Sequence, residues 1–116
     1  MKLKLIVALV SDKKTNAVVQ AARDAGATGA TIIPGVRGEG LKPQKTFLGL
    51  DLAARRDVAL FLVVETRARE ILEHICAAGQ FNDEAGAGIA FEIAIDDVVG
   101  LGTQLPAIRE ELESDL

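Results

Sequence analysis

The chain contains few side chains of the types that bind soft metal ions or act as catalytic nucleophiles and bases. His74 and Cys76, its single histidine and single cysteine, lie two positions apart in a segment of helical periodicity. Side chains at this spacing point in different directions from a helix, so the pair does not suit one metal ion. Cys76 falls on the apolar stripe of that helix, and His74 falls on its exposed side with no nucleophile at hand. We therefore expect neither a metal site nor a catalytic residue.

The carboxylates are numerous, but most of them stand where solvated turns are expected. Asp83-Glu84 lies in a predicted loop, and Asp96-Asp97 lies at the end of a predicted strand. Residues 103–116 carry four carboxylates against Arg109, a net charge of −3, which is typical of a solvated acidic extension. Glu92 is different because it interrupts an apolar strand. It is either a buried acid or the partner of a cation across a subunit contact, and we favour the second interpretation.

Two glycine-rich segments have the composition of an anion-binding site. The first, Gly35-Val36-Arg37-Gly38-Glu39-Gly40, leads into a stretch, residues 37–57, with five cations against three carboxylates in a chain of net charge −4. Its glycines let backbone N–H groups approach an anion closely. The second, Gly86-Ala87-Gly88, precedes a predicted strand. Neither segment is a dinucleotide fingerprint or a Walker loop. The topology brings them together only where subunits meet, which predicts a ligand cleft between subunits.

Hydrophobic periodicity predicts strands and helices in a doubled pattern. Alternating apolar residues indicate strands, and apolar residues at helical spacing indicate helices that end near Gly26 and Gly79. The expected elements are strand 2–10, helix 15–25, strand 27–36 interrupted at Pro34-Gly35, strand 58–65, helix 66–78 with Thr66 as its N-cap, and strand 88–95. This order is typical of the α+β ferredoxin-like βαββαβ sandwich, a four-stranded antiparallel sheet with two helices on one face. We expect one domain at residues 1–102, followed by the acidic C-terminal extension 103–116.

The strands are apolar on both faces, although two helices can cover only one face of a sheet. Both alternating sets of the first strand are apolar: Leu3, Leu5, Val7 and Leu9 on one side, and Ile6, Ala8 and Val10 on the other. A monomer rarely exposes an apolar patch of that size. We therefore expect the second face to be buried, either against copies of the chain in a closed oligomer or under the segment Thr103–Leu116. We favour the oligomer.

Composition and charge exclude other classes of function. Apolar runs such as Leu5–Val10 are too short to cross a bilayer, so the chain is not expected to be embedded in a membrane. No cleavage site of a signal peptide follows that run, which predicts a cytoplasmic protein. An acidic chain with no Trp or Tyr and four Phe does not suit nucleic-acid binding.

The glycine-rich segments resemble motifs of the PII signal-transduction family. Gly26-Ala27-Thr28-Gly29-Ala30-Thr31 and Val36-Arg37-Gly38-Glu39-Gly40 are similar to its G-x-T-G-x-T and V-K-G-x-G segments, and Gly86–Phe91 is similar to its G-D-G-K-I-F turn. The resemblance covers about residues 1–101. It implies a non-enzymatic homotrimer that binds an adenine nucleotide, ATP, ADP or AMP, in clefts between ferredoxin-like subunits. It also implies that a mobile loop at about residues 40–57 contacts a partner, such as a membrane transporter or a metabolic enzyme.

The resemblance implies ligand-binding residues as well. One wall of the cleft would carry Thr31, Arg37, Gly38 and Gly40, and the other would carry Gly86 and Gly88. The phosphate-binding lysine of the family's turn is Ile89 here, and Val98–Gly102 lacks the family's arginines. We therefore expect a divergent member that binds a mononucleotide or another small anion. Positive charge would come from the long loop, at Lys42, Lys45, Arg55 or Arg56.

Two other functions remain open at this point. A small ferredoxin-like enzyme would need an acid–base couple, such as Glu92 with a loop arginine. A CutA-type trimeric metal-binding protein shares the architecture, but His74 and Cys76 do not form its site.

Overall fold

The computed structural model describes residues 2–36, 46–47, 50–51 and 55–114. One sheet is formed by the strands β1 (Leu3–Ser11), β2 (Thr31–Val36), β5 (Arg56–Val64) and β6 (Gly88–Ala94). The helices are α1 (Thr15–Asp24), α2 (Glu65–Gly79) and α3 (Leu105–Ser114). Two short strands, β3 (Thr46–Phe47) and β4 (Leu50–Asp51), pair with each other.

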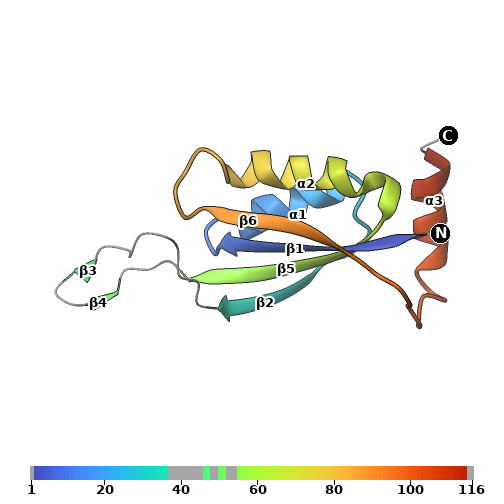
Figure 1. Cartoon of the computed structure of the whole chain (residues 1–116), viewed down its shortest axis with the longest axis horizontal. Helices are drawn as coiled ribbons and strands as arrows, with labels where there is room; N and C mark the ends of the chain where they lie inside the picture. Colours follow the sequence, from blue (N-terminus) through green and yellow to red (C-terminus); the bar gives the residue numbers. More distant parts are fainter. Residues whose placement is uncertain (1, 37–45, 48–49, 52–54, 115–116) are drawn as a thin grey trace.

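The main sheet has the strand order β2-β5-β1-β6, and every neighbouring pair is antiparallel. Helix α1 connects β1 to β2 across β5, and α2 connects β5 to β6 across β1. Both helices lie on the same face of the sheet (Figure 1). The predicted ferredoxin-like βαββαβ fold is therefore confirmed, and its two outer strands are β2 and β6.

The core lies between this face and the two helices. Strand alternation points Ile6, Ala8 and Val10 of β1 toward the helices, and all three are fully buried. Phe61 of β5, which is directly opposite Ile6, is fully buried too. The helices contribute Val18, Ala22, Ala68, Ile71 and Ile75. Each large apolar side chain buried in this way stabilises the fold by about 1.5–3 kcal/mol, so the strands are held firmly in register.

The second strand is shorter than predicted, but it is interrupted at the predicted position. β2 begins at Thr31 rather than at residue 27. Its pairing with β5 shifts register between Ile33 and Val36. Pro34-Gly35 lies within this irregularity. Proline has no backbone N–H to donate to the neighbouring strand, which explains the interrupted pairing.

The start of α2 also differs from the prediction. The helix begins at Glu65 without a side-chain cap, so the predicted capping role of Thr66 is wrong. The backbone N–H of Glu65 instead donates to the carbonyl oxygen of Lys2 at 2.9 Å. A neighbouring strand thus satisfies one of the free donors of the helix N-terminus.

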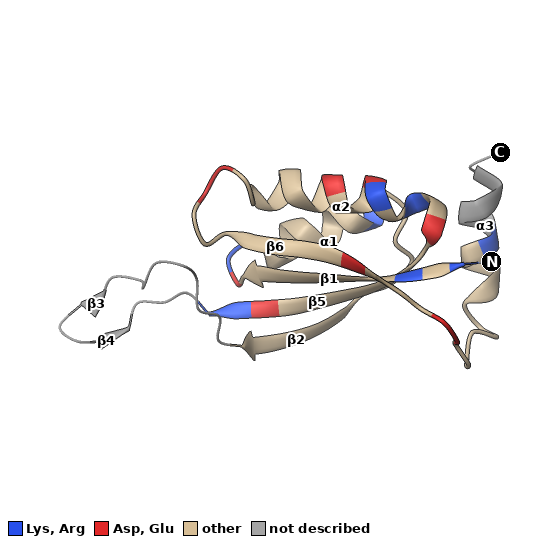
Figure 2. Ribbon diagram, viewed as in Figure 1, with Lys and Arg blue, Asp and Glu red and all other residues tan. Residues whose placement is uncertain are grey.

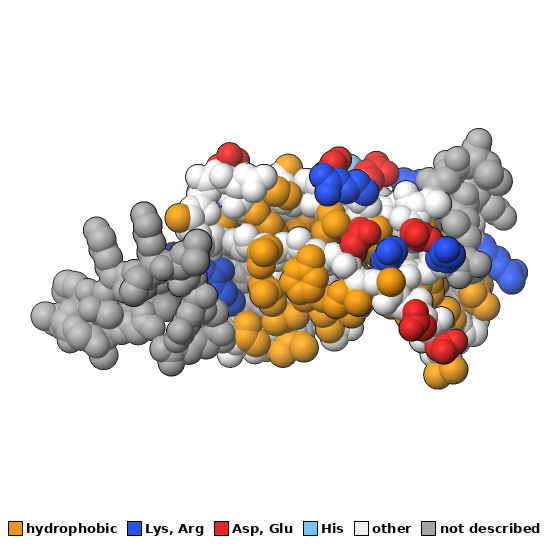
Figure 3. Space-filling view, in the orientation of Figure 1, with side chains coloured by type: hydrophobic (Ala, Val, Ile, Leu, Met, Phe, Trp, Pro, Cys, Tyr) orange, Lys and Arg blue, Asp and Glu red, His pale blue; other side chains and the backbone are white. Residues whose placement is uncertain are grey.

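The second face of the sheet is apolar, and α3 packs on one of its ends. Leu3, Val64 and Ile108 form a buried cluster there. Elsewhere on this face, large apolar side chains stay exposed: Ile33 (47%), Ile89 (58%), Phe91 (41%) and Ile93 (47%). We call this uncovered part the open face, and Figure 3 shows hydrophobic side chains gathered over the strands. The C-terminal segment therefore covers one end of the face and leaves the open face uncovered in a single chain.

Ile108 is expected to anchor α3. Replacing it, Ile108→Ala, removes most of a 3%-exposed side chain from the cluster with Leu3 and Val64, and we expect a loss of about 2 kcal/mol in the free energy of unfolding. Urea denaturation at fixed protein concentration measures this. Val99→Ala is the control, because Val99 is 94% exposed and its truncation should change the stability by less than about 0.5 kcal/mol. Equal effects of the two substitutions would contradict the anchoring role.

Candidate functional site

Both segments that the sequence singled out lie at one end of the sheet, on its opposite edges. Gly88 of β6 pairs with Val10 of β1, which pairs with Asp57 of β5. One residue further along, Ser11 pairs with Arg56, which pairs with Val36. The glycine turn before β6 and the base of the segment between β2 and β5 therefore lie at the same end. We call this the loop end, and Figure 2 shows cationic and anionic segments close together there.

The glycine turn is held by backbone bonds and by close packing. The N–H of Ser11 donates to the carbonyl of Ala87 at 3.0 Å, and Ala87 is buried. A Cβ atom on Gly88 would lie 2.6 Å from the carbonyl oxygen of Leu9 and 2.5 Å from the ring of Phe81. The strand backbone cannot move away without breaking its ladder, so only glycine fits at this position.

The ring of Phe81 also explains the end of α2. A Cβ atom on Gly79 would collide with that ring. The left-handed turn after the helix is made by Gln80, with φ 56°, and not by Gly79. Gly79 is therefore needed for the close approach of Phe81 rather than for its own conformation. The result is a rigid path from α2 into the glycine turn.

Lys14 fixes the loop that leads to the glycine turn. Its ammonium donates to the carbonyl of Gly79 at 3.1 Å, to Gln80 Oε1 at 2.8 Å and to Glu84 Oε2 at 2.7 Å. These three acceptors match the three N–H donors of a lysine. Lys14 is thus committed to holding residues 79–84 in place and has no donor left for a ligand.

Asp57 holds the base of the connection between β2 and β5 in place, as Lys14 holds the loop before the glycine turn. Its Oδ2 accepts a 2.6 Å hydrogen bond from Thr15 Oγ1, and its Oδ1 accepts a longer one, 3.4 Å, from the N–H of Gly35. The backbone N–H of Asp12 donates to the carbonyl of Arg55 at 2.9 Å. Residues 12–15 therefore contact the β5 end of the connection between β2 and β5, and the side chain of Asp57 links that end to Gly35 of β2. Sequence reasoning missed Lys14, Thr15 and Asp57, because a charge count does not reveal partners far away in the chain.

The sequence-predicted ligand residues fall into three groups. Gly86, with φ 75°, and Gly88 lie at the loop end, next to the edge strand β6. Thr31 begins β2, the opposite edge. Three strand spacings, about 14 Å, separate the two edges, so one chain does not bring Thr31 and Gly88 together. The remaining four, Arg37, Gly38, Gly40 and Lys42, lie outside the described residues, as does Lys45.

Thr31 lies on the wall of a pocket of about 600 Å³. The backbone and side chains of residues 28–31 form one wall, and Leu60 and Leu62 of β5 form the floor. Thr103, Gln104 and Ala107, at the start of α3, close the other side. None of the described residues that line this pocket is charged, and its polar groups are hydroxyls and an amide. Such a lining suits a flat, uncharged heterocycle that is held by apolar contact and hydrogen bonds.

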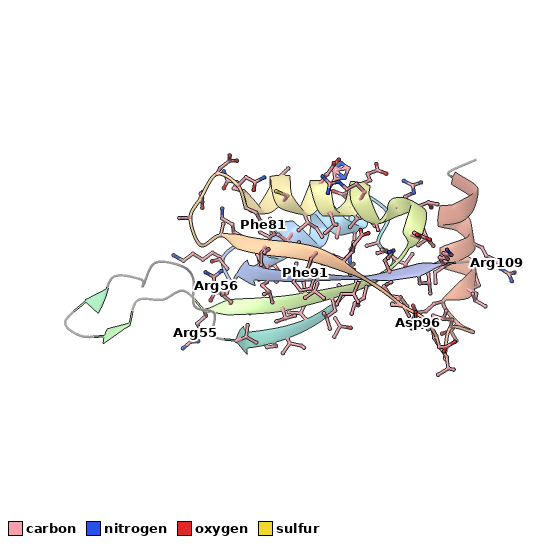
Figure 4. All side chains as sticks on the ribbon, viewed as in Figure 1. Arg55, Arg56, Phe81, Phe91, Asp96 and Arg109 are labelled. Carbon is pink, nitrogen blue, oxygen red and sulfur yellow. The ribbon has the colours of Figure 1, made fainter. Side chains whose placement is uncertain are left out.

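Besides Lys13 and Lys14 of the β1–α1 turn, the described cations at the loop end are Arg55 and Arg56. Arg55 is exposed and Arg56 is half-buried at the start of β5 (Figure 4). Neither forms an ion pair with another residue in the described part of the chain. Ile89, which the sequence analysis placed where the resembling family has a lysine, is 58% exposed. Positive charge at this end is therefore carried by the start of β5 and by the β1–α1 turn, and not by the glycine turn.

Comparison with known proteins identifies the family. The family model "Nitrogen regulatory protein P-II" matches residues 3–104. This chain belongs to the P-II family. The regulatory, non-enzymatic role predicted from the sequence follows from this membership. A search of curated proteins found no match.

Solved structures agree with the P-II assignment. A protein of Thermus thermophilus, described as a PII-like signalling protein, is 25% identical, with a TM-score of 0.60 over 82% of this chain and 87% of that one. A protein of Thiomonas intermedia, described as CPII bound to ADP, AMP and acetate, is 19% identical. Its TM-score is 0.58 over 83% of this chain and 90% of that one, which shows a shared fold.

The remaining described side chains give little support to the enzyme and metal-binding alternatives. His74 is exposed, and Cys76 is half-buried with its Sγ accepting a 3.3 Å hydrogen bond from Asn82 Nδ2. Among the described residues, no three or more His, Cys, Asp or Glu side chains come together as metal ligands would. Glu92 lies 3.9 Å from Lys4 of the same chain, so it already has a cation without a subunit contact. None of the described helices is long and apolar enough to span a membrane.

The glycine turn yields a direct test of the packing at the loop end. Gly88→Ala should lower the free energy of unfolding by about 2–3 kcal/mol, because the new methyl group meets the backbone of Leu9. Chemical denaturation at fixed protein concentration measures the loss. Gly102→Ala is the matched control, since a Cβ atom there meets nothing within 4 Å. Should Gly88→Ala be as stable as Gly102→Ala, the close packing of this turn would be refuted.

Proposed function

We propose that this P-II family member is a cytoplasmic homotrimeric sensor that binds an adenine nucleotide between its subunits. The observation that carries the proposal is the placement of two half-sites on opposite edges of one sheet. The uncharged pocket with Thr31 lies at β2, and the glycine turn Gly86–Gly88 lies at β6. Side-by-side packing of two subunits would bring the β2 edge of one toward the β6 edge of the next, which completes a cleft that a single chain lacks.

The open face supports association into a closed oligomer. Its exposed side chains come from β2 and β6, and Leu60 and Val7 lie between them in the register. Transfer of such a patch out of water is favourable by about 25 cal/mol for each Å² buried. A ring of three copies would bury this face on every subunit without leaving a free end.

The two half-sites suit different parts of a nucleotide. The pocket at Thr31 offers hydroxyls, an amide and leucine side chains to the base. The glycine turn and Arg56 offer backbone N–H groups and positive charge to phosphates. CPII of Thiomonas intermedia, which shares this fold, was solved with ADP, AMP and acetate. We therefore infer that the effector is AMP, ADP or ATP, and that its binding orders the loop at residues 40–57 for contact with a transporter or a metabolic enzyme.

Nucleotide binding is tested by calorimetry with AMP, ADP and ATP. At least one of them should bind the wild-type protein, and Thr31→Val should weaken that binding about fivefold through the loss of one hydrogen bond. Asn16→Ala is the control, because Asn16 is exposed on α1 and should leave the affinity unchanged. An absence of heat with all three nucleotides would contradict the proposed effector.

Association is tested by sedimentation. The wild-type protein should sediment as three copies of the 12.2 kDa chain, and Phe91→Glu should shift it toward smaller species, because a charge on the open face is costly to bury. Val99→Glu introduces the same charge at a 94%-exposed position away from the sheet. Three copies should persist in that variant. A folded wild-type monomer would overturn the proposed trimer and the shared cleft with it.

A further inference from the structure

Residues 12–15, which form the β1–α1 turn and the first position of α1, contact the two halves of the loop end at once. Lys14 and Thr15 are consecutive, but their side chains reach different segments. Lys14 Nζ donates to Glu84 Oε2 at 2.7 Å, in the loop that precedes the glycine turn. Thr15 Oγ1 donates to Asp57 Oδ2 at 2.6 Å, and Asp57 in turn holds the N–H of Gly35. The turn is therefore a physical link between the base of the β2–β5 connection and the Gly86–Gly88 turn.

We propose that Asp57 and Lys14 are positioning residues that couple these two segments through the β1–α1 turn. A ligand that orders one segment would then order the other. The significance for regulation rests on the proposed function, because it assumes an effector at the glycine turn. The coupling itself is a property of the chain without ligand.

Burial and charge make this link stiff. Thr15 is 5% exposed, and the side chain of Lys14 is 19% exposed. Both bonds involve an ionised partner, which makes them shorter and stronger than neutral hydrogen bonds. The turn leads directly into α1, whose Val18 and Ala22 are fully buried in the core. A close-packed core resists small shifts of α1, so we expect a displacement of the Lys14 backbone to reach the adjacent Thr15.

Two substitutions test the coupling in the unliganded protein. Lys14→Met removes all three donors at the glycine-turn side, and its effect is read at the amide of Gly35 on the other side. Asp57→Asn keeps the size of the side chain but removes an acceptor and the charge, and its effect is read at the amide of Ala87, which donates to the carbonyl oxygen of Glu84 at 3.2 Å. Hydrogen exchange measured by NMR reports both amides. The controls, Lys13→Met and Asp12→Asn, change the same charges at exposed positions of the same turn.

The expected result is an acceleration of exchange at the remote amide by at least about threefold in each variant, with no change in either control. Exchange of the Ile71 and Ile75 amides in α2 serves as a reference, because global destabilisation would accelerate these amides as well. If Lys14→Met affects only residues 79–88 and Asp57→Asn only residues around Gly35, the segments are independent and the proposal is overturned.

A second measurement separates this inference from the proposed function. Calorimetric titration with AMP is carried out on the wild-type protein, both variants and the double variant. With coupling, each single substitution weakens AMP binding, and the double variant weakens it by less than the product of the two single factors. Additive losses would overturn the coupling while leaving nucleotide binding intact. If the wild-type protein binds no nucleotide, the proposed function fails, and the exchange experiment still decides whether the segments are linked.

Discussion

Apolar side chains on both faces of one four-stranded sheet set the main constraint on this protein. Two helices cover one face, and α3 covers only the end around Leu3 and Val64. The open face is left in contact with water in a single chain, and the hydrophobic effect acts against that exposure. Association of copies in a ring would remove this exposure by placing the sheet of one copy beside the sheet of another. Under the proposed function, the same arrangement would create clefts between sheet edges, so the need to bury apolar surface and the supply of a ligand site would have one physical origin.

The charged groups at the loop end are divided between internal and external tasks. Lys14 and Asp57 are used within the chain, where each one satisfies several hydrogen-bond partners. Arg55 and Arg56 have no such partners in the described part of the chain and lie where the long connection joins β5. Strand alternation explains the division, because Asp57 points to the helix side and Arg56 to the opposite side. Of two neighbouring residues in the sequence, Asp57 thus stabilises the fold, and Arg56 stays available for a ligand under the proposed function.

Much of the fold was predictable because it depends on local patterns. Alternating residues identified the strands, and Pro34-Gly35 marked the irregularity in β2. The role of Asp57 was not predictable, because its partner Thr15 lies 42 positions away, and Glu84 lies 70 positions from Lys14. A charge pattern in one sequence does not specify such contacts. The candidate site was predictable only in part: Thr31 was found through a motif, and the structure places it on the wall of a pocket. The opposite wall depends on how Ile108 docks α3 on the sheet, which no local pattern indicates.

The distribution of charge also bears on what a nucleotide sensor of this kind would distinguish. The described lining of the pocket at Thr31 is uncharged, so under the proposed function it would bind a base without regard to the number of phosphates. The glycine turn is followed by Ile89 instead of a cation, so it adds backbone N–H groups but no positive charge. Two described cations at this end, Arg55 and Arg56, stand at the base of the long connection. Under the proposed function, phosphate charge is therefore sensed where that connection leaves the sheet. The number of phosphates in AMP, ADP or ATP would then directly affect the segment that contacts a partner. The base would bind in the same way in all three nucleotides.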